Sequence, residues 1–527
     1  MLVVSRTVTA LTRLLDIVTL IETDHRVQIV FTTDPANAAV FRRGVEAFLT
    51  ELDGVVVSWD QAVAGRFDLI IAASENDRLE QLTGPILLVP HGIGFQKHYP
   101  GSRTVAGMNP NRLLHNGRVV PTAIGISHID QHARLASRCP PAGPRAALIG
   151  DPALDRLLAS RYCRSLYRAE LGGTGRTLVL LASTWGPESL LGRFPHLPEQ
   201  IATALPVDDY RVAAVLHPGI SAAHGAWQVR AWLARATAAG VRVISPDRWQ
   251  SALIAADCVV SDQGSIALYA AALDIPLLLT PGDSGQTVPD SPLALLAAKA
   301  ARLDVTGDLW RQLGAAGTAY PDQSWHDLAL MAAGLPGESA AVLRALLYRL
   351  LNLPEPDEAA DYPPVAPPPR TAEPPVALVV GVTEHTNTEH DDVVLHRFPA
   401  AEHGPPRPGL DYRHLVVDAA KGSVRQLAAA SVLTCHSPDD FPAIAAELLA
   451  QWPDARLVAT VRDTATCLVH TRHELLALTV PAPPAGFDPL LLASLAFVRA
   501  SQRRPLTGQH NLRCGDEVVT VQVGRPS

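Results

Sequence analysis

Two histidines in this chain each end a short apolar run and stand just before a sharp turn. His91 follows the run Pro85–Pro90 and precedes Gly92, and His217 follows Arg211–Leu216 and precedes a proline. A histidine can act as a general base toward a hydroxyl because its pKa lies near neutrality, and its neutral ring can donate to a phosphate oxygen. We therefore expect His91 to be a base and His217 to bind a phosphate. The alternative is that each ring only bonds to the backbone at the end of a strand.

Lys97 lies six positions after His91, in a chain that otherwise uses arginine. It is one of only three lysines among the 44 basic residues. A compact ammonium group can neutralise a phosphate as a point charge. We expect Lys97 and the Gly92 backbone to contact the acceptor or a phosphate.

The segment Ser261-Asp262-Gln263-Gly264-Ser265 joins the apolar run Cys258–Ser261 to an alanine-rich helical pattern, Ser265–Leu273. A helix N-terminus carries unsatisfied N–H groups and a partial positive charge, so it suits a diphosphate. Plain N-capping by Asp262 or Ser265 is the alternative. Ser183 and Thr184 follow another apolar run, Arg176–Ala182, and can face the same ligand. The expected donor-binding residues are Ser183, Thr184, Ser261, Asp262, Gly264 and Ser265.

Continuous apolar runs alternate with helical patterns over the first 350 residues or so, and the series restarts near Arg176. This alternation is typical of parallel sheets covered on both faces. In such sheets ligands bind at the carboxyl ends of the strands, where each of the residues above lies. The sequence therefore predicts α/β architecture with two Rossmann-like domains in tandem. The expected strands are Arg26–Thr32, Phe67–Ala73, Pro85–Pro90, Arg176–Ala182, Arg211–Leu216, Val241–Ile244, Cys258–Ser261 and Pro276–Thr280.

A proline-rich stretch divides the chain. Residues 353–375 should form an extended linker, because proline cannot donate to a strand ladder and disfavours helix before it. The predicted domains are residues 1–160 on the acceptor side and 161–352 on the nucleotide-donor side. Residues 376–527 are predicted to form a mixed α/β module of unknown role.

Composition narrows the function classes. The chain has 527 residues with 47% hydrophobic and 18% charged, which excludes wholesale disorder. A formal charge of −8 argues against a dedicated nucleic-acid binder. Six scattered cysteines with no CxxC pair indicate neither a disulfide framework nor a metal site, and they fit a reducing cytoplasm. No stretch is long and apolar enough for a membrane span, so any membrane contact should be peripheral.

Four short motifs in this order resemble the bacterial CDP-glycerol glycerophosphotransferase family, the teichoic-acid polymerase type. They are His91-Gly92 with Lys97, Gly150-Asp151-Pro152, Ser183-Thr184-Trp185, and Ser261 to Ser265. The resemblance spans roughly residues 26–350. It implies the GT-B arrangement, with the active site in the cleft between two Rossmann-like domains. It also implies transfer of glycerophosphate from CDP-glycerol to a hydroxyl acceptor in cell-envelope polymer biosynthesis, with no cofactor.

The motifs also depart from that family's pattern. Ile93 stands where the family has threonine, Gln263-Gly264 stands where it has tyrosine and serine, and Ser183 replaces a proline. The Ser-Asp-Gln-Gly-Ser form is also similar to UDP-N-acetylglucosamine 2-epimerases and other GT-B transferases. We therefore expect a transferase that uses a CDP- or UDP-linked donor. The alternatives are an epimerase-like enzyme acting on a UDP-sugar and a non-catalytic nucleotide-binding or interaction scaffold.

Overall fold

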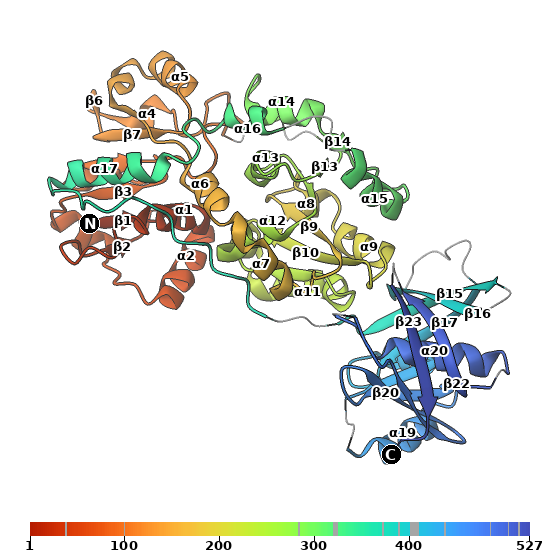
Figure 1. The fold of residues 1–527 in the computed structure, drawn as a ribbon. Helices are drawn as coiled ribbons and strands as arrows, with labels where there is room; N and C mark the ends of the chain where they lie inside the picture. Colours follow the sequence, from red (N-terminus) through yellow and green to blue (C-terminus); the bar gives the residue numbers. More distant parts are fainter. Residues whose placement is uncertain are drawn as a thin grey trace.

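The computed structural model consists of two α/β domains followed by a closed barrel (Figure 1). It describes residues 1–36, 39–99, 101–282, 285–319, 325–370, 374–387, 390–400, 411–436, 439–484, 486–503, 505–514 and 517–526. None of the helices in these ranges combines the length and hydropathy needed to cross a bilayer.

The first domain is built on a parallel sheet in the order β2-β1-β3-β4-β7-β8. Its strands are β1 (Leu2–Val4), β2 (Val30–Thr32), β3 (Ile70–Ala72), β4 (Ile86–Leu88), β7 (Ala123–Ile126) and β8 (Ala146–Leu148). The flanking elements are α1 (Val8–Val18), α2 (Ala39–Leu52), α3 (Trp59–Ala64), α4 (Pro110–Leu113), α5 (Asp130–Arg138) and the hairpin β5 (Leu114–His115)–β6 (Arg118–Val119). β1, β7 and β8 were not among the predicted strands, because each has only three or four residues and lacks a long apolar run.

The second domain has a parallel sheet in the order β11-β10-β9-β12-β13-β14. Its strands are β9 (Thr177–Ser183), β10 (Tyr210–Leu216), β11 (Arg242–Ile244), β12 (Cys258–Ser261), β13 (Leu277–Leu279) and β14 (Ala301–Arg302). Its helices are α7 (Arg164–Glu170), α8 (Leu190–Arg193), α9 (Leu197–Ala204), α10 (Pro218–His224), α11 (Ala226–Ala238), α12 (Trp249–Ala255), α13 (Ser265–Ala272), α14 (Pro292–Lys299), α15 (Leu309–Ala319) and α16 (His326–Leu330). The two Rossmann-like domains expected from the sequence are confirmed, and they face one another in the GT-B arrangement.

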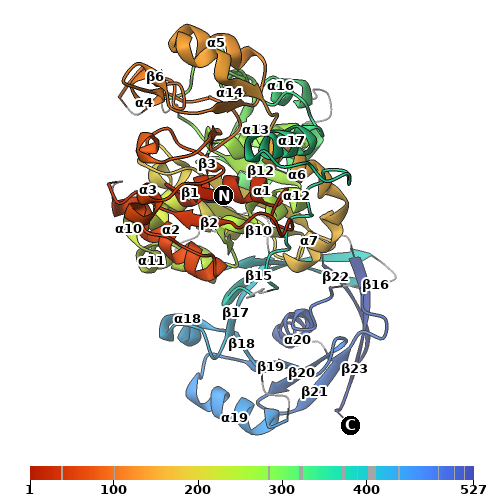
Figure 2. The same ribbon diagram turned by 90° about the vertical axis from the view of Figure 1, so that its left-hand side faces the viewer.

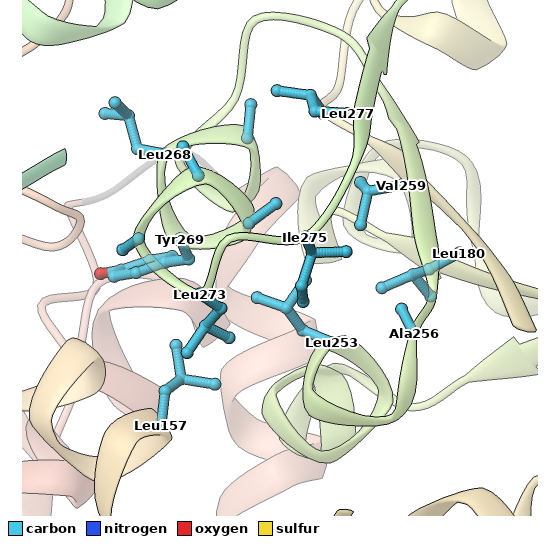
Figure 3. Close-up of a cluster of buried hydrophobic side chains, with 14 of the residues drawn as sticks. Leu157, Leu180, Leu253, Ala256, Val259, Leu268, Tyr269, Leu273, Ile275 and Leu277 are labelled. Atoms are coloured by element: carbon cyan, nitrogen blue, oxygen red, sulfur yellow. The ribbon is translucent and has the colours of Figure 1, made fainter. Parts of the chain in front are cut away.

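Helix α13 is surrounded by apolar side chains on several sides. Figure 3 shows Leu268 of this helix, and Leu273 just after its end, among residues such as Leu157 and Leu253, which come from neighbouring helices. From Ala267 to Ala272 every residue of α13 is buried. This packing fixes the position of the start of the helix, where a ligand was expected.

One helix that follows the second domain in sequence packs against the first domain. α17 (Ser339–Leu351) follows the second domain in sequence, but Leu343 and Leu347 belong to the same buried cluster as β1 and α1 of the first domain (Figure 1). By residue number it falls in the range predicted for the second domain, whereas its apolar face is covered by the first. Between the two sheets the chain forms α6 (Pro152–Ala159) and α7, which are separated by a short 3₁₀ turn.

The proline-rich stretch has no helix or strand in its described part, residues 353–370, which we call the proline strap. It lies against both domains. In the strap, the Val365 amide donates to the Ser160 hydroxyl at 3.0 Å, and the Tyr167 hydroxyl donates to the Val365 carbonyl at 2.6 Å. Tyr362 is buried and lies 3.1 Å from the Ser339 hydroxyl. The strap is therefore docked against both Rossmann-like domains.

The C-terminal module is a closed barrel in the order β15-β16-β22-β23-β21-β20-β19-β18-β17. Its strands are β15 (Ala377–Asn387), β16 (His390–Pro399), β17 (Asp411–Asp418), β18 (Val432–Cys435), β19 (Leu457–Val461), β20 (Thr466–Thr471), β21 (Leu475–Thr479), β22 (Gly508–Cys514) and β23 (Glu517–Gly524). Its helices are α18 (Val424–Ala429), α19 (Phe441–Gln451) and α20 (Leu491–Ser501). Figure 2 shows α20 lying inside the ring of strands, where its apolar residues share one buried cluster with the inward-facing strand residues.

Candidate active site

A cavity of about 280 Å³ lies between the two Rossmann-like domains, at the carboxyl ends of their strands. Both domains contribute to its walls. Every residue that the sequence analysis singled out lines it: His91, Gly92, Lys97, Ser183, Thr184, His217, Ser261, Asp262, Gly264 and Ser265. The fold thus brings together side chains that are up to 174 positions apart in sequence (91 to 265).

The His91 ring reaches into the cavity from the loop after β4. It is open to the cavity but surrounded by protein atoms, and it makes no hydrogen bond to a described residue. Burial lowers the pKa of His91, and the carboxylate of Glu75 opposes this effect. The neutral ring is therefore the favoured form near pH 7, which is the form that can accept a proton.

Glu75 lies just beyond β3 and shares the cavity wall with His91. Its Oε1 atom accepts from the Tyr99 hydroxyl and, at 2.5 Å, from the Gly107 amide. Only 6% of Glu75 is exposed. Two donors therefore hold this carboxylate in a fixed position near the His91 ring.

The His217 ring is fixed in one neutral tautomer by its neighbours. Its Nδ1 atom accepts from the Gly219 amide at 3.0 Å, so the ring proton of the neutral form lies on Nε2. Nε2 then donates to the Thr9 hydroxyl at 3.2 Å, across the gap between the domains. Burial, and the charges of His91 and Lys97, lower the pKa of His217 to about 3. His217 can therefore donate one hydrogen bond but carries no charge at neutral pH.

No side chain among the described residues caps the start of α13. Gly264 occupies the N-cap position, and no described side chain accepts from the first amides of the helix. The plain capping alternative for Asp262 and Ser265 is therefore wrong. Ser265 is exposed to the cavity, and a Cβ atom added at Gly92 would lie 3.0 Å from its hydroxyl oxygen. The His91 loop thus approaches the helix start so closely that glycine is the residue that fits best.

Asp262 holds the neighbouring loop in place. Its Oδ2 atom accepts from the Thr184 amide and hydroxyl, both at 2.8 Å, and from the Leu190 amide at 2.9 Å. Ser183 is also engaged within this loop, since its hydroxyl donates to the Thr184 carbonyl and accepts from the Leu191 amide. The Ser261 hydroxyl and the Oδ1 atom of Asp262 are buried with no partner among the described residues.

Lys97 lies on a segment that pairs with the second domain. Lys97 forms an antiparallel bridge with Thr287, and the flanking amides of His98 and Val288 donate across the same contact at 2.7 and 2.9 Å. Burial lowers the pKa of Lys97, and the Asp262 carboxylate opposes this. The cation is therefore held in the cavity by backbone that belongs to both domains.

A buried ion pair forms part of the cavity wall. Arg13 of α1 donates to both carboxylate oxygens of Asp151, at 3.0 and 2.6 Å, and the Tyr269 hydroxyl of α13 donates to Asp151 at 3.1 Å. Burial alone would lower the pKa of Arg13, but the Asp151 carboxylate, together with Tyr269 and Asp16, outweighs this effect and the pKa is raised. Three elements from both domains therefore meet at one charged group. Among the described residues there is no group of His, Cys, Asp or Glu that could hold a metal ion.

Three wall residues were missed by the sequence analysis: Thr9, Arg13 and Glu75. Each follows a strand of only three residues or lies in the helix after one. The available signal was the N-terminal Leu2–Val4 run followed by Thr7, which accepts from the Ala10 amide as the N-cap of α1. Arg13 and Asp16 are charged residues inside that helix, and both are buried.

No family model matches the chain, and no curated protein matches it in sequence. Among solved structures it is similar to the wall teichoic acid polymerase TagF, with 12% identity and a TM-score of 0.43, over 67% of this chain and 88% of that one. It is similar to HepE of Anabaena, solved with UDP and glucose, with 13% identity and a TM-score of 0.37, over 67% and 99% of the two chains. It is also similar to MnaA of S. aureus, solved with UDP, with 13% identity and a TM-score of 0.39, over 68% and 99%.

Proposed function

We propose that the protein is a GT-B transferase that moves a glycerophosphate or glycosyl group from a nucleotide-diphosphate donor to a hydroxyl acceptor. One observation carries the proposal. A neutral, unbonded histidine from the first domain and the uncapped start of a helix from the second domain open into the same cavity. The first can act as a base toward a bound hydroxyl, and the second can bind an anion.

The donor diphosphate would lie at the start of α13. The free amides of this helix start offer hydrogen bonds and a partial positive charge to the diphosphate. The Ser265 hydroxyl and the Nε2–H group of His217 add donors, and Lys97 adds a charge. Ser183 and Asp262 shape the adjoining loop, which places Thr184 beside the donor.

The reaction then needs two aids from the protein. His91 takes the proton of the acceptor hydroxyl while the oxygen of that hydroxyl forms a bond to the transferred group. The bond from that group to the nucleotide phosphate breaks, and its electron pair goes to the leaving phosphate oxygen. The helix start, His217 and Lys97 stabilise the negative charge on that oxygen.

A donor screen tests the proposal. The full chain is incubated with CDP-glycerol, UDP-glucose or UDP-N-acetylglucosamine, with and without polyol acceptors, and products are measured by mass spectrometry. CDP-glycerol with a polyol of the bacterial envelope is the first pair to test. Nucleotide release that needs the acceptor, and that is lost in His91→Gln without loss of donor binding, is the expected result.

The alternatives give different results in the same screen. An epimerase yields product from the UDP-sugar alone, with no acceptor. A binding scaffold yields a measurable donor affinity and no product with any pair. Either result would overturn the transferase proposal.

A further inference from the structure

A second cavity, of about 1000 Å³, lies where the second domain meets the barrel. It is lined by β10 and α11 of the second domain, by residues 374–376 and by Pro399 at the end of β16. It shares Leu216, Pro218 and Pro246 with the active-site cavity as a common wall. Its volume is at the upper end of the range for ligand pockets, which often lie between domains.

The cavity exists because β11 is shorter than the strand it pairs with. β11 pairs only with Ala213–Val215 of β10, so the first half of β10 has no strand beyond it at this edge of the sheet. The barrel approaches there instead (Figure 2). At the rim of the cavity the Val207 amide donates to the Arg397 carbonyl at 2.8 Å, and the Val376 amide donates to the Ala238 carbonyl at 3.1 Å.

A further contact holds the barrel beside the cavity. Arg397 of the barrel pairs with Asp208 of the second domain and, at 2.6 Å, with Asp488 of the barrel. Arg397 is only 3% exposed. The junction between the second domain and the barrel is therefore held by hydrogen bonds and ion pairs. The cavity is not simply a gap between two loosely placed domains.

Most of the wall is apolar, but Arg211 lies on it. The Nη1 atom of Arg211 donates to the Val207 and Tyr210 carbonyls, at 2.6 and 3.3 Å. Its Nε and Nη2 atoms make no hydrogen bond to a described residue. This pair of atoms is one of the edges with which a guanidinium group binds a carboxylate or phosphate in bidentate fashion.

A second arginine lies on the same wall. The Nη1 atom of Arg242 donates to the Glu170 carbonyl at 2.5 Å, while its Nη2 atom is buried with no partner among the described residues. Burial lowers the pKa of both arginines, that of Arg211 to about 10, and the nearby charge of Arg176 adds to the effect on Arg211. Neither side chain forms an ion pair with a described carboxylate, although the charges of Asp208 and Asp488 act on Arg211 and that of Glu170 acts on Arg242. An anion in the cavity would satisfy the donor atoms that these two arginines leave without a partner among the described residues.

We propose that this second cavity binds an anionic amphiphile with a single apolar chain. The carboxylate or phosphate head binds the Nε–Nη2 edge of Arg211, with Arg242 as a second cation. The chain lies against the apolar residues of β10 and α11, such as Val212, Val229 and Leu233. This site does not depend on the transfer reaction proposed above.

Titration calorimetry of the full chain with decanoate and with decanol tests the head-group assignment. Because a hydrogen-bonded charge contributes about 1.5–3 kcal/mol, decanoate should bind at least tenfold more tightly than decanol. Arg211→Gln should remove that preference, and Arg242→Gln should reduce it if Arg211→Gln fails to fold. Equal affinities of decanoate and decanol for the unmodified chain, or no binding of decanoate, would overturn the proposal.

A pair of substitutions on α11 tests the location. Ala234 lines the cavity, whereas Ala231 is exposed on the same helix outside it. Ala234→Trp should fill the cavity and weaken decanoate binding at least tenfold, and Ala231→Trp should leave it unchanged. If both variants bind decanoate as the unmodified chain does, the amphiphile binds elsewhere.

Discussion

The Nε2 atom of His217 and the hydroxyl of Thr9 lie 3.2 Å apart, on opposite sides of the gap between the two Rossmann-like domains. The Gly219 amide already occupies Nδ1, so Nε2 is the only ring atom that can donate to a ligand. In the proposed reaction this atom donates to the donor phosphate. Thr9 therefore competes with the donor for the same hydrogen atom.

Replacing Thr9 with valine removes that competitor without changing the size of the side chain. We expect the donor affinity of Thr9→Val to rise about two- to tenfold, the value of one hydrogen bond, as measured by calorimetry. Thr19→Val, at the other end of α1, is the control. A weaker donor affinity in Thr9→Val would show that Thr9 itself contacts the donor.

The activity should depend on pH through His91. Because burial lowers its pKa below the ordinary value of 6.5, the ring is neutral near pH 7 and becomes protonated only on acidification. A protonated ring cannot act as the base, so kcat/KM should be constant near neutrality and fall at a pH below 6.5. Glu75 favours the charged ring, so Glu75→Gln should move this inflection to still lower pH. An inflection that Glu75→Gln does not move would remove His91 as its source.

The contact between Gly264 and Thr184 allows a test by compensation. A Cβ atom at Gly264 would lie 2.7 Å from the Cγ2 methyl of Thr184. Gly264→Ala should therefore displace the loop and weaken donor binding about tenfold, as expected for overpacking. Thr184→Ser removes the methyl group and keeps the hydroxyl that donates to Asp262. The double variant should recover most of the affinity, and no recovery would mean that Gly264 is needed for a different reason.

The ion pair between Arg13 and Asp151 should matter for stability. Arg13 is 3% exposed and Asp151 1%, so removing one partner leaves the other buried and uncompensated. We expect Arg13→Met to lower the free energy of unfolding by about 3–5 kcal/mol, measured by urea denaturation. Arg26, whose side chain is 43% exposed, pairs with Asp24, and Arg26→Gln should lower the free energy of unfolding by about 1 kcal/mol or less. Similar losses in both variants would contradict this account.

Much of the cavity wall could be predicted because the signal is local. His91, His217 and Ser261 each end or follow a strand that is recognisable from its apolar run, and parallel strands bring such positions to one edge of a sheet. Glu75 and Arg13 could not be found in this way, because their role in the cavity wall depends on which residues, distant in sequence, lie opposite them. Nothing in the sequence near Arg13 indicates that Asp151 will lie against it.

The barrel illustrates the same limit on a larger scale. The prediction of a mixed α/β module is confirmed. Its closure was not predicted, because it depends on the pairing of β16 with β22, in which Asp392 lies opposite Asn511. Such contacts, distant in sequence, leave no pattern in either segment alone. For the same reason the position of α20 inside the barrel could not be inferred from its composition.

The proline strap has a mechanical consequence for the two Rossmann-like domains. Its bonds to Ser160 and Tyr167, together with the buried ring of Tyr362 beside α17, tie it to the region where the two Rossmann-like domains join. If the two domains moved apart, the strap would have to break its contacts with them or be stretched. The strap therefore limits how far the two Rossmann-like domains can move apart. Any change in the angle between these domains would also be transmitted through the strap to the barrel that follows it.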